Sequence, residues 1–112
     1  MRTGQGERLA YRGSLKMNIR EMVVAKLVKQ ETNWVIGGYV NAVSDGHRKQ
    51  IPHRNELVQE VYNGVINAKV VETAGGTISV TTDIRFIGRQ RIMEMVEKRV
   101  DKILKEEGMR KC

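Results

Sequence analysis

The sequence predicts a helix-rich α+β domain, in which three helices are followed by a β-hairpin and a long C-terminal helix. Apolar residues recur at helical spacing before position 66 and after position 88. Between them, apolar and polar residues alternate from Thr77 to Ile87, as in a strand with one buried face. The turn sequence Ala74-Gly75-Gly76 directly precedes this alternation. A chain of 112 residues suffices for one domain with a single modest core.

The two ends of the chain differ from the part between them. Residues 1–16 are basic, contain several glycines and show neither helical nor strand periodicity, which predicts a flexible tail. Two explanations of this tail stay open: a genuine disordered N-terminus, or a native start at Met17, where the first periodic segment begins. The ordered domain is expected at 17–108, with 109–112 as a frayed basic end.

Two helices are predicted in the first half of the domain. The first runs from Asn18, paired with Glu21 in a capping box, to about Gln30, and Thr32-Asn33 forms a break. In residues 34–45 the spacing of the apolar side chains favours a second helix over a strand. The pair Gly37-Gly38 argues against it, because two glycines cost a helix about 2 kcal/mol relative to alanines.

If residues 34–45 are helical, the close approach of a neighbouring helix best explains the glycine pair. Gly46 then ends the helix in a left-handed conformation. Trp34, the only tryptophan, is expected to anchor the core.

The third helix is predicted from Pro52 or His53 to Asn63, because proline suits a first helical turn. Its outer face offers Asn55, Gln59 and Asn63 at intervals of four residues. The hairpin follows, with Val70 opposite Val80 and Ala68 opposite Thr82, which keeps both apolar sets on one face.

The last helix is predicted to begin after Gly88 and to end at Gly108. Its apolar stripe is long for so small a domain to cover, which predicts a homodimer. The dimer interface is expected to contain Met93, Val96, Val100 and Ile103. The alternative is a monomer, in which this helix folds back on a sheet face formed by Val80, Ile84 and Phe86.

The charge distribution suggests a polyanion as partner. The net charge is +7, and the basic excess lies in residues 1–16, 47–55 and 88–112. Arg54, Arg89 and Arg91 occupy first helical turns, where a cation is unfavourable unless an anion such as phosphate is shared. The competing interpretation is that the positive charge serves only solubility.

The predicted order of elements resembles that of winged-helix proteins, although no sequence motif of a family is recognisable. This resemblance implies a DNA-binding regulator that reads a duplex with its third helix and hairpin. Ten residues are the expected nucleic-acid contacts: Arg48, Lys49, His53, Arg54, Asn55, Gln59, Lys69, Arg85, Arg89 and Arg91.

Other function classes have little support in the sequence. No catalytic motif, cofactor motif or metal-ligand spacing is present, so a non-enzymatic cytoplasmic protein without a membrane partner is expected. The alternative to nucleic-acid binding is a protein–protein interaction module, for instance a regulator or inhibitor of a partner protein. Salt separates the two, because phosphate contacts weaken steeply with salt and apolar docking does not.

Overall fold

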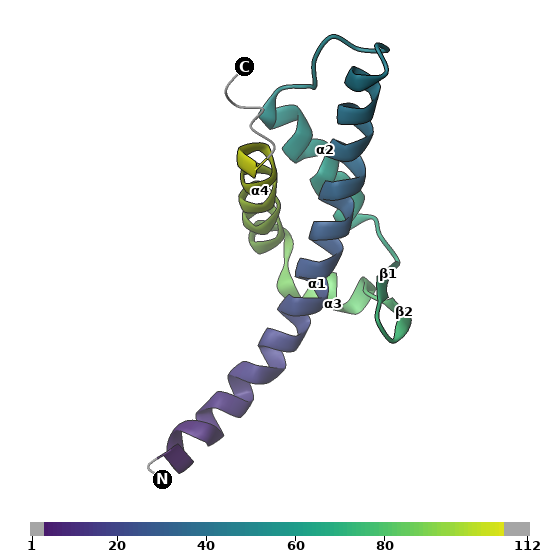
Figure 1. Cartoon of the computed structure of the whole chain (residues 1–112). Helices are drawn as coiled ribbons and strands as arrows, with labels where there is room; N and C mark the ends of the chain where they lie inside the picture. Colours follow the sequence, from purple (N-terminus) through teal and green to yellow (C-terminus); the bar gives the residue numbers. More distant parts are fainter. Residues whose placement is uncertain (1–3, 107–112) are drawn as a thin grey trace.

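The computed structural model describes the backbone of residues 4–106 and the side chains of residues 19–106 (Figure 1). Its described part contains four helices and one antiparallel hairpin, which confirms a helix-rich α+β chain. The elements are α1 (Gly4–Ser44), α2 (Arg54–Ile66), β1 (Val70–Thr73), β2 (Gly76–Ser79), α3 (Thr81–Ile87) and α4 (Arg89–Glu106).

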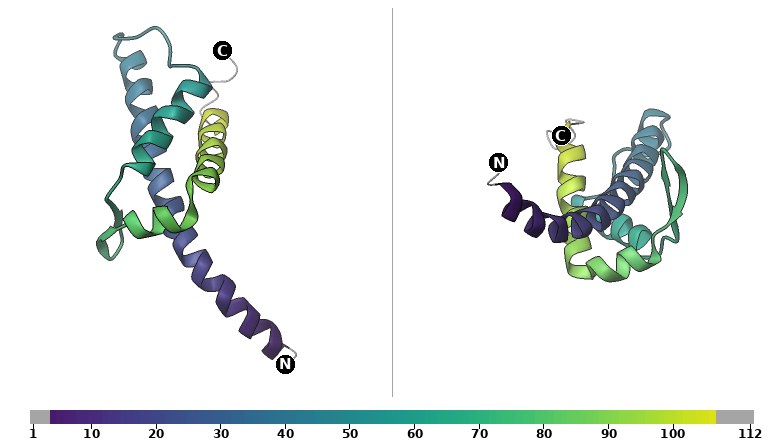
Figure 2. Two further views of the ribbon diagram at one scale, coloured as in Figure 1. Left: turned by 180° about the vertical axis from the view of Figure 1, so that it is seen from behind. Right: turned by 90° about the horizontal axis from the view of Figure 1, so that it is seen from below.

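Three helices form the body of the molecule. α1, α2 and α4 each pack against the other two, α3 crosses below them, and β1 contacts α1 (Figures 1 and 2). The first turns of α1 extend away from all other elements.

The core lies along one stripe of α4. Ile92, Val96 and Val100 follow at intervals of four residues and have no exposed surface. They share one apolar cluster with residues of α1 and α2, among them Val24, Leu27, Val28, Leu57, Val61 and Val65.

This burial corrects the predicted dimer interface. Val96 and Val100 lie inside a single chain and are not available to a second copy, while Met93 and Ile103 pack half-buried against the same core. The monomer alternative anticipated that this helix folds back, but its main partners are α1 and α2 instead of a sheet. Whether the chain forms a dimer through another surface stays a prediction.

The first two predicted helices are one continuous helix. The backbone of Asn18 lies inside α1 instead of at a helix start, and the chain does not break at Thr32-Asn33. The Thr32 hydroxyl is buried and donates a hydrogen bond to the Val28 carbonyl oxygen at 2.7 Å, so this polar residue is satisfied within the helix. The backbone is also helical from Gly4 through residue 16, where no regular structure was predicted, and the flexibility of this segment stays a prediction.

The predicted strand Thr77–Ile87 is wrong beyond Ser79. Val80 is fully buried and leaves the strand conformation; its amide donates to the Lys69 carbonyl, and its own carbonyl accepts the amide of Ile84. The segment Thr81–Ile87 is α3. Its alternating apolar residues also satisfy a helical spacing, and burial of Val80 and Ile84 selects the helix. Phe86, expected in the core, is about half exposed.

The hairpin register also differs from the prediction. Val70 pairs with Ser79 and Val71 with Ile78, because the turn contains two residues instead of three. Val71 is buried, whereas Val70 and Ile78 are exposed.

The helix ends were predicted more accurately. Gly46 has a φ of 81° after α1, as expected for a left-handed residue. α2 starts at Arg54, so Pro52 precedes the helix, and it continues to Ile66. Gly88 separates α3 from α4, while the predicted stop at Gly108 lies outside the described residues.

The burial of α4 predicts a stability difference between two isoleucines. Ile92→Ala removes a fully buried side chain and should lower the free energy of unfolding by about 2–5 kcal/mol. Ile19→Ala, at a position that is 54% exposed, is the matched control and should cost less than about 1 kcal/mol. Urea unfolding followed by circular dichroism measures both, and equal losses would contradict this account of the core.

Candidate functional site

Most of the predicted nucleic-acid contacts lie in two groups, one near each end of α2. Arg48, Lys49 and His53 lie in the loop before α2, whereas Lys69 follows its C-terminus. Arg85 and Arg89 line a small groove that also contains Ile66 and Ala68. The thirteen residues of α2 hold the two groups about 20 Å apart. The residues proposed to read bases, Asn55 and Gln59, are exposed between them.

Two of the predicted phosphate ligands already have carboxylate partners. The Arg54 guanidinium donates to both carboxylate oxygens of Asp101 at 2.8 and 3.0 Å, which joins α2 to α4. Arg91 donates to Glu21 at 3.3 and 3.4 Å and to Glu94 at 3.3 Å. The hydrogen bond from Arg54 lowers the pKa of the Asp101 carboxyl. Carboxylates therefore offset these cations at the helix N-termini, and phosphate is not needed for that purpose.

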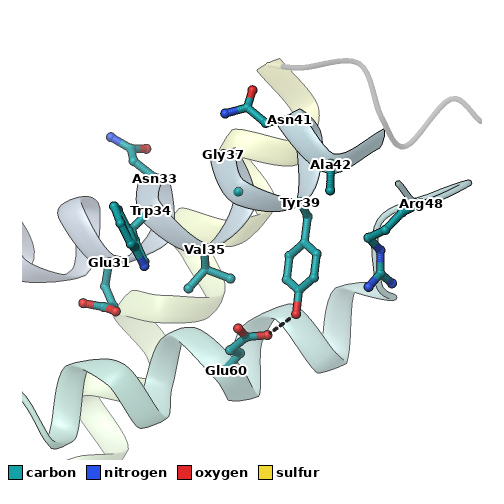
Figure 3. Close-up of a pocket in the computed structure, with 11 residues that line it drawn as sticks. Glu31, Asn33, Trp34, Val35, Gly37, Tyr39, Asn41, Ala42, Arg48 and Glu60 are labelled. Atoms are coloured by element: carbon teal, nitrogen blue, oxygen red, sulfur yellow. Dashed lines mark hydrogen bonds between the residues drawn. The ribbon is translucent and has the colours of Figure 1, made fainter. Parts of the chain in front are cut away.

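Acidic side chains also flank the exposed face of α2. Glu56 and Glu60 are exposed beside Asn55 and Gln59, so this face is a poor attractor of phosphate. The Tyr39 hydroxyl donates to Glu60 at 2.8 Å, which raises the pKa of Tyr39 (Figure 3). The Arg48 guanidinium lies 4.9 Å from the centre of the Tyr39 ring.

A second group of cations lines a groove between α1 and α4, on the side away from α2. We call it the basic groove; its volume is about 550 Å³. Its lining consists of Met22, Ala25, Lys26, Val28, Lys29, Met95, Lys98, Arg99 and Lys102. Five of these nine described residues are basic, and none is acidic.

Most cations of the basic groove lack a partner within the described chain. Lys26, Lys29 and Lys98 form no ion pair there, and Lys102 only approaches Glu106 at 4.0 Å. The Nε atom of Arg99 is buried without a hydrogen-bond partner. A buried donor left unpaired is costly, and the ammonium groups of the lysines remain available to an anion in the groove.

The sequence prediction missed this groove because its residues come from segments about seventy positions apart. A signal was present on each helix: Lys26 and Lys29 are three residues apart, and Lys98 and Lys102 are four apart, so each pair shares a face. Nothing in the sequence indicated that the two faces meet.

Comparison with family models, curated proteins and solved structures found no match for this chain. Among the described residues, no helix combines the length and apolar content that crossing a membrane requires. No group of three or more His, Cys, Asp or Glu side chains in that part of the chain is placed to hold a metal ion.

The Arg54–Asp101 pair predicts a specific pH dependence. Because the folded-state pKa of Asp101 is lowered, the pair stabilises the fold above the unfolded pKa of about 3.9, and this contribution is lost as pH falls through the folded value. In Arg54→Gln, the pKa of Asp101 should rise towards about 3.9. A carboxyl-carbon NMR titration measures it, with Arg85→Gln as a control that removes an exposed cation elsewhere. An unchanged Asp101 titration in Arg54→Gln would refute this coupling.

Proposed function

We propose that this chain binds double-stranded nucleic acid through backbone phosphates held in the basic groove between α1 and α4. The observation that carries the proposal is the juxtaposition of five cations from two helices without a carboxylate among the described lining residues. The basic loop and α2 are the weaker candidates, since Arg54 is neutralised by Asp101 and α2 carries exposed glutamates.

The groove has the dimensions that contact with a phosphate backbone requires. Packed helices lie about 8–10 Å apart, so lysines of α1 face those of α4 across a short gap and repel one another. Lys98 and Lys102 are one helical turn apart, about 6 Å along α4. A row of phosphates placed along the gap replaces repulsion by attraction and releases the counterions that the nucleic acid had condensed.

A duplex fits the groove better than a single strand does. Single-strand binding commonly uses aromatic side chains on which bases stack. The groove contains no aromatic residue, and the exposed Trp34 lies on the side of α1 that faces α2. Contacts to phosphates alone also imply little sequence preference.

The winged-helix hypothesis makes a different prediction for the same ligand. It places α2 in the major groove and the hairpin along the backbone, with Asn55 and Gln59 at base edges and Lys49, Lys69 and Arg85 on phosphates. In this chain α2 does lead directly into the hairpin, which supports that arrangement. Because the basic groove lies on the other side of the bundle, one duplex segment cannot occupy both surfaces.

Two variants with the same loss of charge distinguish the surfaces. Lys26→Gln/Lys29→Gln/Lys98→Gln should lower duplex affinity at least about tenfold and reduce the magnitude of the log–log salt slope by about 2.7, or 0.9 for each phosphate that is no longer neutralised. Glutamine is a good helix former, so the fold should persist. Fluorescence anisotropy of a labelled random duplex at several salt concentrations measures both quantities.

The control is Lys49→Gln/Lys69→Gln/Arg85→Gln, which removes three exposed cations from the surface that the winged-helix hypothesis uses. Its salt slope should change by less than about one unit. If this control loses more affinity than the groove variant, the basic groove is not the binding surface and the winged-helix arrangement is favoured. Absence of duplex binding by the wild-type chain at low salt would refute both.

A further inference from the structure

A second unpartnered surface of α1 lies on the side facing α2. It is a groove of about 720 Å³, which we call the Trp34 groove (Figure 3). Trp34 stands at one end of it with 79% of its surface exposed, although it is the only tryptophan of the chain. From there the groove runs along α1 towards Arg48 and is lined by Gly37, Gly38, Asn41 and Ala42.

The glycine pair in this groove has no neighbour. A Cβ atom added at Gly37 or Gly38 would meet nothing within 4 Å. Gly64 of α2 provides the contrast, because a Cβ there would lie 2.6–2.8 Å from side-chain atoms of Glu31. The close approach between α1 and α2 is therefore made at Gly64. The two glycines weaken α1 without serving any contact in the described chain.

The hairpin covers this face of α1 only in the part that precedes Trp34. Leu27 is buried there, and the Gln30 side chain donates to the Glu72 carbonyl oxygen at 2.6 Å. One turn further along α1, Trp34 is without this cover. The uncovered part therefore starts where the hairpin ends.

We propose that the Trp34 groove binds the same groove of a second copy of this chain, through an antiparallel pair of α1 helices centred on Gly37 and Gly38. Such a centre lies midway between Trp34 and Asn41, which are seven residues, or about 10.5 Å, apart on one face. The two-fold axis then places each Trp34 ring beside the partner's Asn41, in the open end of the groove. The glycines allow the two backbones to approach closely there.

The charges of the groove select the antiparallel orientation. Glu31 lies at the Trp34 end, Glu60 accepts the Tyr39 hydroxyl hydrogen bond, and Arg48 lies at the opposite end over the Tyr39 ring. An antiparallel pair brings Glu31 of each copy towards Arg48 of the other, whereas a parallel pair would place Glu31 beside Glu31 and Arg48 beside Arg48. The Trp34 ring of the second copy can also stack its face on the Arg48 guanidinium of the first copy. The two rings alone would bury about 300 Å² of mostly apolar surface.

Trp34 itself reports the association. In sedimentation velocity without nucleic acid, from about 1 to about 500 μM, the wild-type chain should shift from monomer to dimer, as expected of a small interface. Over the same range, the Trp34 emission should move to shorter wavelength as the ring loses water. Both measurements are made with reducing agent and about 0.15 M salt, which excludes a Cys112 bridge and screens the repulsion between basic copies.

Two substitutions at Gly38 test the geometry. Gly38→Leu fits the monomer, where the position faces open space, but blocks the approach of a second α1 and should abolish the dimer. Gly38→Ala should raise the melting temperature of the dilute monomer and still weaken association several-fold. The control Ala25→Leu enlarges an exposed small residue on the α4 side of α1 and should leave the dimer intact.

The proposal is overturned if the wild-type chain stays monomeric throughout this range, or if Gly38→Leu dimerises as the wild type does. If Gly38→Leu does not fold, Gly38→Ala still tests the proposal. That variant should melt at a higher temperature than the wild type and yet associate more weakly, and unchanged association would overturn the proposal.

Discussion

Burial of the Ile92, Val96 and Val100 stripe is the constraint on which the rest of the structure depends. These side chains leave water only if α1 and α2 both close over α4, so the stripe determines that three helices pack side by side. The contact also brings Lys26 and Lys29 next to Lys98 and Lys102. One apolar requirement thus builds the core and assembles the basic groove on the outer side of the same helix pair.

Ion pairs between elements divide the cations into two classes. Arg20 pairs with Asp83 at 3.2 Å, Arg54 with Asp101 and Arg91 with Glu21, so each pair joins two different helices. Exposed pairs of this kind contribute little stability individually. They do lower the charge available to a ligand at the ends of α2 and α4. In the described chain, no cation of the basic groove forms an ion pair with a carboxylate of another helix. For this reason we place the proposed ligand in the basic groove.

Much of the helical structure could be predicted from the sequence, and the failures have identifiable causes. α2 and α4 carry long apolar stripes that only a helix explains. The stretch after Gly76 contains apolar residues that fit a strand and a helix equally well, and burial of Val80 decided between them. The break expected at Thr32 did not occur, because its hydroxyl bonds within the helix. The basic groove could not be foreseen, since it depends on a tertiary contact between segments distant in the chain.

The most direct test of the phosphate-binding account is a backbone-amide NMR titration of the wild-type chain with a short random-sequence DNA duplex. If phosphates bind in the basic groove, the largest chemical-shift changes fall on residues 22–29 of α1 and 95–102 of α4, and these changes become smaller as salt is raised. Changes concentrated instead on residues 47–63 and the hairpin, with the α1 and α4 amides unmoved, would contradict binding in that groove.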